Sequence, residues 1–266
     1  MKDKKAVWAK GYAEEMNRAF AFALDLKKPT KGEICLSAAS CYKIYADGKL
    51  LGFGPNRASH GHCRFATYTF EARCIVAEVL NVYAQNFCWV KQKPFFSCEV
   101  KTENGEAYSA EDFVCFELTD RVQKVQRYSF QRGFAEVYEI FADHGALYVG
   151  DLSKTPYPRC EKEDAALPKV LPSYTENPLL EEVSARAIDS GAVRINDTLP
   201  AWTDRSQTEV GGLLEGYKRR EWQAFPTDEV SKFEFHSGEN GGDYSYETVD
   251  FSRIYAGITE LDIEAE

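Results

Sequence analysis

The sequence lacks the features that define several broad classes of protein. No apolar run approaches the ~18–20 residues that a membrane-spanning helix requires, so no membrane insertion is expected. Methionine occurs only 2 times, whereas 15 Tyr and 17 Phe favour strands over helices. Basic residues number 32 against 42 acidic ones, and the net charge of −10 argues against nucleic acid as a partner, because binding to phosphates needs clustered Lys and Arg.

Sequence motifs of common enzymes and cofactor sites are also missing. The chain has no GxxxxGK[ST] phosphate loop, no GxGxxG dinucleotide motif and no GxSxG nucleophile elbow, so no cofactor is expected. His60, His62 and Cys63 lie close together in the sequence. Zinc needs three or four ligands, however, and the spacing indicates no fourth, so no metal is expected either.

No secretory leader is evident, and the cysteines carry no motif. Residues 1–15 are charged, and the apolar stretch at 19–24 is too short and too far into the chain for a signal peptide. A cytoplasmic location is therefore expected. Eight cysteines occur without a C-x-x-C pair. In a reducing compartment we expect them to be free thiols that act as small apolar core residues.

The clearest local pattern is a β-hairpin. Two β-rich runs flank the Asp-Gly dipeptide at 47–48, which fits a two-residue type I′ turn. Pairing outward from this turn places Ile44 opposite Leu51, and Tyr42 opposite Phe53. The two-residue period of a strand then puts these four side chains on one apolar face, which a second sheet would have to cover.

The rest of the first 150 residues predicts further short strands. Helical patterns occur only at 13–22 and 179–187. Many short strands separated by turn residues are typical of an antiparallel β-sandwich, which we expect over residues 1–150. The expected strands lie at 74–83, 95–102, 112–118, 129–140 and 146–149, and later at 233–235, 244–251 and 257–264.

Composition changes after residue 150. Half of the ten prolines lie between 156 and 178, which predicts an extended connector over 151–209. Strand patterns resume afterwards, so 210–266 is expected to be a partial second β-sandwich. The final segment alternates polar and apolar residues as a half-buried strand does. Such a strand would have unfilled pairing groups, and we expect the chain to end inside a second sheet domain.

Three sequence blocks carry recognisable motifs. They read SCYKIYADGKLLGFGPNRASHG at 40–61, RYSFQRGFAEVY at 127–138 and VDFSRIYAGI at 249–258. The first resembles a YKLYVNGK-type hairpin followed by GxGPxRAxHG, the second is similar to RxSxQRxFxExY, and the third to YDFGxxxxGF. In this order, the blocks resemble the N-terminal β-sandwich region of bacterial α-L-rhamnosidase-like glycoside hydrolases.

The resemblance implies a mostly β protein, with a galactose-binding-like jelly roll followed by part of a second β-sandwich. It also implies a larger enzyme, in which an α/α toroid holds the catalytic acid and base. No helical repeats of that kind occur here, so the resemblance predicts a non-catalytic accessory region. Its expected partners are a rhamnose-containing glycan or glycoside and the missing C-terminal catalytic domain.

Catalytic carboxylates do not stand out among the 42 acidic residues. Glycoside hydrolysis generally needs two carboxyl groups about 5–9.5 Å apart across the scissile bond. Strand alternation places Glu136 on one face with Arg132 and Tyr138, which favours a structural ion pair. An enzyme with an unrecognised carboxylate pair between the two domains is an alternative interpretation.

Sugar recognition requires an aromatic platform beside polar side chains. Tyr83, Asn86 and Trp89 offer both within one predicted loop, and Arg57 and His60 lie in the loop after the hairpin. These five are the candidate carbohydrate-binding residues. Alternatively, Trp89 packs in the core or against the missing domain. The expected function is an accessory, carbohydrate-contacting region of an α-L-rhamnosidase-like hydrolase, and the alternative is a standalone carbohydrate-binding module.

Overall fold

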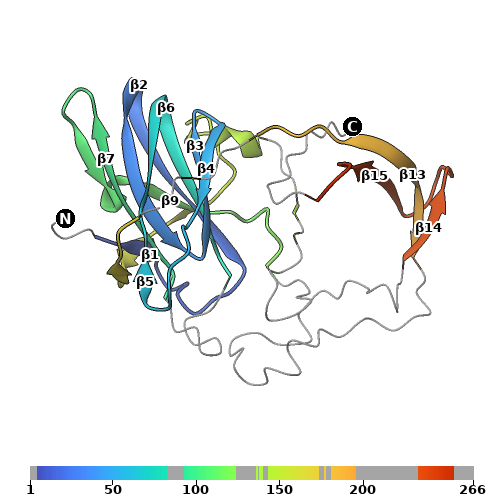
Figure 1. Ribbon diagram of the computed structural model, residues 1–266, viewed down its shortest axis with the longest axis horizontal. Helices are drawn as coiled ribbons and strands as arrows, with labels where there is room; N and C mark the ends of the chain where they lie inside the picture. The colour runs from blue at the N-terminus through green and yellow to red at the C-terminus, as the bar shows by residue number, and fades with distance from the viewer. Residues whose placement is uncertain are drawn as a thin grey trace. The chain divides into compact units, whose positions relative to one another are not determined.

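A computed structural model describes residues 5–82, 93–123, 136, 138–139, 143–173, 177, 181–195 and 233–254. Over these residues the secondary structure is almost entirely antiparallel β-strand, with two short 3-10 helices and no α-helix (Figure 1). No described helix has the length and apolar character needed to cross a lipid bilayer. The prediction of a mostly β fold is confirmed.

The described residues form two compact units, 5–177 and 181–254. The elements of the first unit are β1 (Val7–Ala9), β2 (Arg18–Ala39), β3 (Cys41–Ala46), β4 (Lys49–Gly54), β5 (His62–Cys63), β6 (Ala66–Asn81), β7 (Phe95–Thr102), β8 (Ala107–Ser109), η1 (Ala110–Asp112), β9 (Val114–Glu117), η2 (His144–Ala146), β10 (Arg159–Cys160), β11 (Lys162–Asp164) and β12 (Lys169–Val170). The elements of the second unit are β13 (Arg186–Ile195), β14 (Phe233–Ser237) and β15 (Tyr244–Asp250).

Two long strands, β2 and β6, organise the first unit as a sandwich (Figure 1). Their antiparallel register is interrupted between Asp25 and Thr30. On one side of this break, β2 and β6 lie in a layer with β11, β1 and β7; on the other side they lie in a layer with β10, β9, β3 and β4. A strand that passes from one layer to the other at an irregular position is a common way to make the corner of a sandwich.

The space between the layers is filled by aromatic and aliphatic side chains. Along β2, Phe20, Phe22 and Leu24 point into this core, while the intervening alanines face the other side of the sheet. The ring of Phe22 stacks on that of Phe96, with centroids 4.4 Å apart. Trp8 meets Phe20 edge-on at 5.2 Å. This alternation places the large side chains of β2 between the layers.

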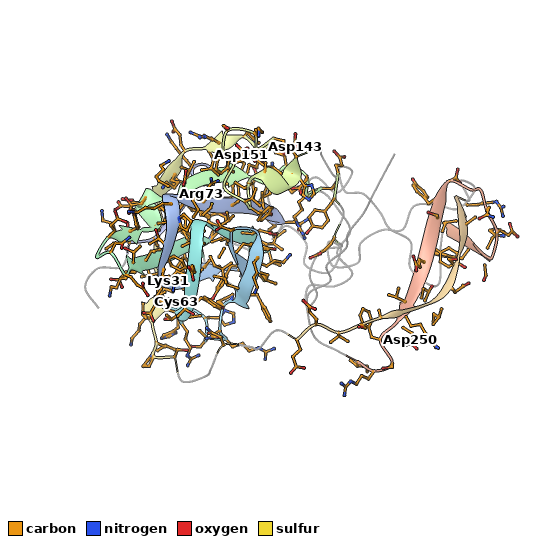
Figure 2. All side chains as sticks on the ribbon, turned by 90° about the horizontal axis from the view of Figure 1, so that it is seen from above. Lys31, Cys63, Arg73, Asp143, Asp151 and Asp250 are labelled. Carbon is orange, nitrogen blue, oxygen red and sulfur yellow. The ribbon has the colours of Figure 1, made fainter. Side chains whose placement is uncertain are left out.

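The outer face of the β9–β2–β6 layer is covered by residues 143–158. Leu147 and Tyr157 pack on the outward-facing side chains of this layer, among them Ala21, Val76 and Phe116. The guanidinium of Arg73 donates a hydrogen bond of 3.2 Å to the carbonyl of Val149. Figure 2 shows Arg73 on the same side of this unit as Asp143 and Asp151 of the covering segment. The covering residues therefore protect a second face of the sheet from water.

Residues 159–170 belong to the first unit. The strand β10 pairs with β9, β11 pairs with β1, and β12 pairs in parallel with β5. The proline content predicts an extended connector here, whereas the structure has three short paired strands. The proposed division of the whole chain at residues 150 and 209 stays a prediction.

The predicted hairpin is present with the expected bounds, as β3 and β4. Its register matches the prediction next to the turn, where Ala46 pairs with Lys49. An irregularity between Ile44 and Tyr45 then shifts the pairing by one residue, so that Ile44 faces Gly52 rather than Leu51. A side chain at Gly52 would collide with the ring of Tyr68, which explains why glycine occupies this position.

Beyond the irregularity, the predicted hairpin face is wrong in part. Tyr42 and Ile44 are buried in the core as expected, and Leu51 packs against it. Phe53, however, pairs with Lys43, and Gly54 lies opposite Tyr42. A bulge adds one residue to one strand only, and therefore reverses the face of every residue that follows it.

The turn residue Asp47 also holds the corner of β6. Its φ of 45° and that of 83° for Gly48 are as a type I′ turn requires. The Asp47 carboxylate accepts hydrogen bonds from the backbone amides of Arg73, at 3.0 Å, and Cys74, at 2.8 Å. One side chain thus satisfies two donors where the β2–β6 ladder is interrupted.

Replacing Asp47 with alanine should lower the free energy of unfolding by about 2 kcal/mol, because two backbone amides lose a charged acceptor. Asp47→Asn keeps one acceptor oxygen and tolerates a positive φ, so it should cost less than half as much. Urea unfolding of both variants measures the difference. Equal stability of Asp47→Ala and the original chain would contradict this role.

The helical interpretation of 13–22 and 179–187 is wrong. Residues 18–22 begin β2, and Arg186 begins β13, while the described residues before each strand contain no α-helix. The alternating Ala and Phe of this part of β2 pair on one side with β6 and on the other with β9. Pairing with two strands outweighs the intrinsic helical preference of alanine.

The second unit is a three-stranded antiparallel sheet in the order β14–β13–β15. The strands predicted at 233–235 and 244–251 correspond to β14 and β15, so these predictions are confirmed. Asp189 of the central strand accepts hydrogen bonds from Ser237 at 2.5 Å and from Tyr246 at 2.8 Å, which join the three strands through their side chains. The strand predicted at 257–264 lies outside the described residues.

Candidate functional site

The loop between β4 and β5 contains two of the five candidate carbohydrate-binding residues. It follows the hairpin at Pro55 and ends at His62, where β5 begins. Both Arg57 and His60 are exposed on this loop. Tyr83, Asn86 and Trp89 lie outside the described residues, so the assignment of all five to one site stays a prediction.

The backbone of this loop is held by Arg64, which follows β5. The Nε atom of Arg64 donates to the carbonyl of Pro172 at 3.0 Å, and its Nη1 atom donates to the carbonyl of Arg57. The Nδ1 atom of His62 lies 3.0 Å from both Ser59 Oγ and the His60 carbonyl oxygen. These contacts fix the backbone while leaving the side chains of Arg57 and His60 exposed.

The segment 168–173 supports the loop from the side. The amide of Lys169 donates to the carbonyl of Gly61 at 3.0 Å, and the amide of Leu171 donates to that of Cys63 at 2.9 Å. Together, 55–64 and 168–173 contain two arginines, one lysine and two histidines but no carboxylate. In a chain with a net charge of −10, this is a local surface of opposite sign.

The neighbouring cysteine is turned away from the loop. Cys63 is buried with Ala6, Phe65 and Phe95, and its Sγ atom lies 3.7 Å from the carbonyl oxygen of Pro168. Its thiol therefore does not share the exposed side of the loop with His60. Among the described residues, no group of three His, Cys, Asp or Glu side chains is arranged to hold a metal ion.

An open hollow of about 790 Å³ lies near the β3–β4 turn, at the other end of β4 from this loop. Leu51 and Phe70 supply apolar surface, but Phe70 is only 6% exposed and offers no platform for a sugar. Lys31 pairs with Glu71 at 3.6 Å. The charged residues around the hollow are Lys31, Lys49, Lys101, Glu33, Glu71 and Glu103.

A buried polar cluster, which was not predicted from the sequence, surrounds Arg121. Its guanidinium donates to Asn17 Oδ1 from Nε at 3.1 Å and from Nη2 at 3.0 Å, and to the Tyr138 hydroxyl from Nη1 at 2.7 Å. Glu136 Oε1 lies 3.7 Å from Arg121 Nη1, which confirms the prediction that Glu136 forms an ion pair. Asn17, Arg121 and Glu136 are far apart in the sequence, and no motif connects them.

Tyrosine hydroxyls next to this cluster serve as hydrogen-bond donors. Tyr148 donates to Glu78 at 3.2 Å, and Tyr157 donates to Asp120 at 2.9 Å. Burial raises the pKa of both phenols, and the neighbouring carboxylates raise it further. Both remain neutral donors at physiological pH, which is a structural role.

Comparison with known proteins gives a relationship in fold. No protein-family model matches the chain, and no curated protein is significantly similar to its sequence. Among solved structures, the GH78 family rhamnosidase of Bacillus sp. GL1 is similar to 77% of this chain, with a TM-score of 0.51 and 16% identity. The aligned part is 23% of that rhamnosidase.

Two further structures are less similar. The α-L-rhamnosidase from Dictyoglumus thermophilum matches 75% of this chain and 24% of its own, with a TM-score of 0.43 and 12% identity. A lectin from Pleurotus ostreatus, solved in complex with GalNAc, matches 74% of this chain and 58% of its own, with a TM-score of 0.37 and 12% identity.

The chain therefore spans about a quarter of the length of the rhamnosidases that it matches. The similarity to the Bacillus enzyme confirms the resemblance at the level of the fold: this chain has a β fold like that of part of the rhamnosidase. Fold similarity alone assigns neither a reaction nor a ligand.

Proposed function

We propose that this chain is the non-catalytic accessory region of an α-L-rhamnosidase-like glycoside hydrolase, and that it contacts carbohydrate through the loop 55–61. The observation that supports this most directly is the block at 40–61. It forms the hairpin that the resemblance implies and continues into a loop with a held backbone and exposed Arg57 and His60. The catalytic carboxylates would lie in a separate domain. The small matched share of the Bacillus rhamnosidase, 23% of its chain, supports this.

The chemistry of the loop suits sugar hydroxyl groups. The guanidinium of Arg57 offers several N–H donors, and the imidazole of His60 offers a donor and an acceptor. Aromatic surface would come from Tyr83 and Trp89, on which the apolar C–H face of a pyranose can stack. Rhamnose, which has both hydroxyl groups and an apolar methyl group, is the proposed ligand.

Isothermal titration with L-rhamnose and rhamnosides tests the sugar contact. The intact chain should bind weakly, and Arg57→Ala and Trp89→Ala should each weaken binding at least about tenfold, because a lost hydrogen-bonding or stacking group costs roughly 1.4 kcal/mol or more. Lys49→Ala, at the open hollow, is a matched surface control and should leave the affinity unchanged. Absence of any heat signal from the intact chain would contradict carbohydrate contact.

Hydrolysis of p-nitrophenyl α-L-rhamnoside tests the absence of turnover. The purified chain should release p-nitrophenol no faster than buffer, since the proposal places the catalytic carboxylates in another domain. Measurable turnover would favour the enzyme interpretation instead.

A standalone carbohydrate-binding module would also bind sugar without turnover. Attaching the chain to a toroid domain distinguishes the two, because an accessory region should increase turnover by that domain.

A further inference from the structure

Two cysteines of the first unit face each other across neighbouring strands. Cys115 of β9 and Cys160 of β10 are direct partners in the antiparallel register. The amide of Glu117 donates to the carbonyl of Pro158 at 3.0 Å, so the alternation of the ladder makes the cysteines a hydrogen-bonded pair with Cα atoms about 5.5 Å apart. Disulfides join Cα atoms that are about 4.4–6.8 Å apart. The strand geometry therefore permits a bond between the two sulfurs.

This arrangement is specific to these two residues among the described cysteines. The others that lie in paired strands face other residue types; Cys35, for example, pairs with Thr67 and Glu99, and Cys74 with Asp25. The described cysteines are Cys35, Cys41, Cys63, Cys74, Cys98, Cys115 and Cys160, and all of them are free thiols in this structure.

The two thiols differ in access to solvent. Cys115 is only 1% exposed and forms part of the core between the layers. Cys160 lies on the edge strand β10, packs against the same core and remains partly exposed. A small oxidant can reach Cys160 from solvent, whereas the core shields Cys115.

The electrostatic environment separates the two thiols further. A hydrogen bond between them lowers the pKa of Cys160 and raises the pKa of Cys115, and burial adds to the rise for Cys115. Partial burial and the negative charge of Glu117 oppose the lowering of the Cys160 pKa, while a hydrogen bond from the Glu117 backbone and the positive charge of Arg18 add to it. Because the thiolate is the reactive form, Cys160 is the better nucleophile and Cys115 retains its proton.

We propose that Cys115 and Cys160 form a peroxide-responsive pair that closes a disulfide between β9 and β10. The Cys160 thiolate attacks one oxygen of hydrogen peroxide and breaks the O–O bond, which gives a sulfenic acid and hydroxide; the proton released by Cys160 converts the hydroxide to water. The Cys115 sulfur then attacks the Cys160 sulfur, and its proton leaves with the sulfenic oxygen as a second water. Two thiols are oxidised, and one peroxide is reduced to two waters.

The disulfide would join the edge strand β10 covalently to β9. The strand β10 has only two register partners on β9, and it connects the covering residues 143–158 to β11. A covalent link closes the chain between positions 115 and 160, which restricts the unfolded state. The oxidised form should therefore unfold at a temperature about 5–10 °C higher than the reduced form.

The test uses the full chain, which is first reduced, then freed of reductant and treated with hydrogen peroxide. Peptide mapping by mass spectrometry without reductant should find a peptide that joins Cys115 to Cys160, with the loss of two hydrogen atoms. Cys160→Ser should lose both this peptide and the rise in melting temperature. Cys41→Ser, which removes an exposed cysteine outside the pair, should retain both.

Cys115→Ala could destabilise the core, so the resolving role of Cys115 is tested in the unsubstituted chain. A sulfenic acid at Cys160 should be trapped by dimedone only when the reagent is present during oxidation, because Cys115 consumes it quickly. Persistent sulfenic acid, over-oxidation of Cys160 without a cross-link, or a bond from Cys160 to another cysteine would each overturn the proposal.

Discussion

Replacing Phe22 with alanine is expected to lower the free energy of unfolding of the first unit by about 3–5 kcal/mol. The Phe22 ring is fully buried between the layers. It stacks on Phe96 with an interplanar angle of 18° and lies 6.0 Å from the ring of Trp8. The substitution leaves a cavity beside two other aromatic rings, which cannot close it without leaving their own contacts.

Urea unfolding followed by circular dichroism and tryptophan fluorescence measures this loss. Phe22→Leu is the matched variant, since it keeps most of the apolar volume and should cost less than half as much. Phe235→Ala, in the second unit, removes a ring that is 63% exposed and should cost less than about 1 kcal/mol. A loss below 1 kcal/mol for Phe22→Ala would contradict its place at the centre of the core.

The sequence predicts local structure well where neighbouring residues interact with each other. The hairpin around the Asp-Gly turn at 47–48 and the strand β7 have the predicted bounds, because the turn dipeptide and the β-rich runs lie next to one another in the chain. The face of Phe53 could not be predicted, since no residue type marks Leu51 as the extra residue of β4. The glycines that follow the bulge in β4 leave room for the rings of Tyr42 and Tyr68, which lie on other strands.

Long-range pairing is the part of the fold that the sequence pattern does not contain. The proline-rich composition of 151–173 predicts a connector, yet its short strands pair with β9, β1 and β5, which precede it by many residues. Similarly, alanine at alternate positions of 18–24 permits a helix as well as a strand. Its pairing with both β6 and β9 determines the outcome.

The candidate site shows the same difference between local sequence signals and long-range contacts. The sequence correctly indicates that Arg57 and His60 lie on an exposed loop after the hairpin. It does not indicate that Arg64 and Pro172 hold this loop, because these residues meet only after β12 pairs with β5. The pairing of Cys115 with Cys160 is equally invisible in the sequence, since the C-x-x-C spacing that usually marks a cysteine pair is absent.

Replacing Arg121 with alanine is expected to lower the free energy of unfolding by about 3 kcal/mol. Arg121 is 8% exposed and Asn17 is 1% exposed, and the two hydrogen bonds from the guanidinium to Asn17 Oδ1 join the segment after β9 to the residue that precedes β2. Without the guanidinium, this buried oxygen loses both donors, which costs the desolvation of a polar group as well as the hydrogen bonds themselves. The Asn17 amide still donates to Gln123 at 2.7 Å and would hold the side chain in its unsatisfied position.

Urea unfolding of further variants separates these contributions. Arg121→Lys should recover little stability, because an ammonium cannot donate through the planar fork that reaches Asn17 and Tyr138 together. Glu136→Gln should cost less than about 1 kcal/mol, since the Glu136 side chain is 65% exposed and its ion pair with Arg121 is screened by water. The double variant, Arg121→Ala with Asn17→Ala, should lose much less stability than the sum of the two single losses. Each single substitution already breaks the same two hydrogen bonds, so their effects are not independent. Full additivity would show that the Arg121–Asn17 contact does not stabilise the sandwich.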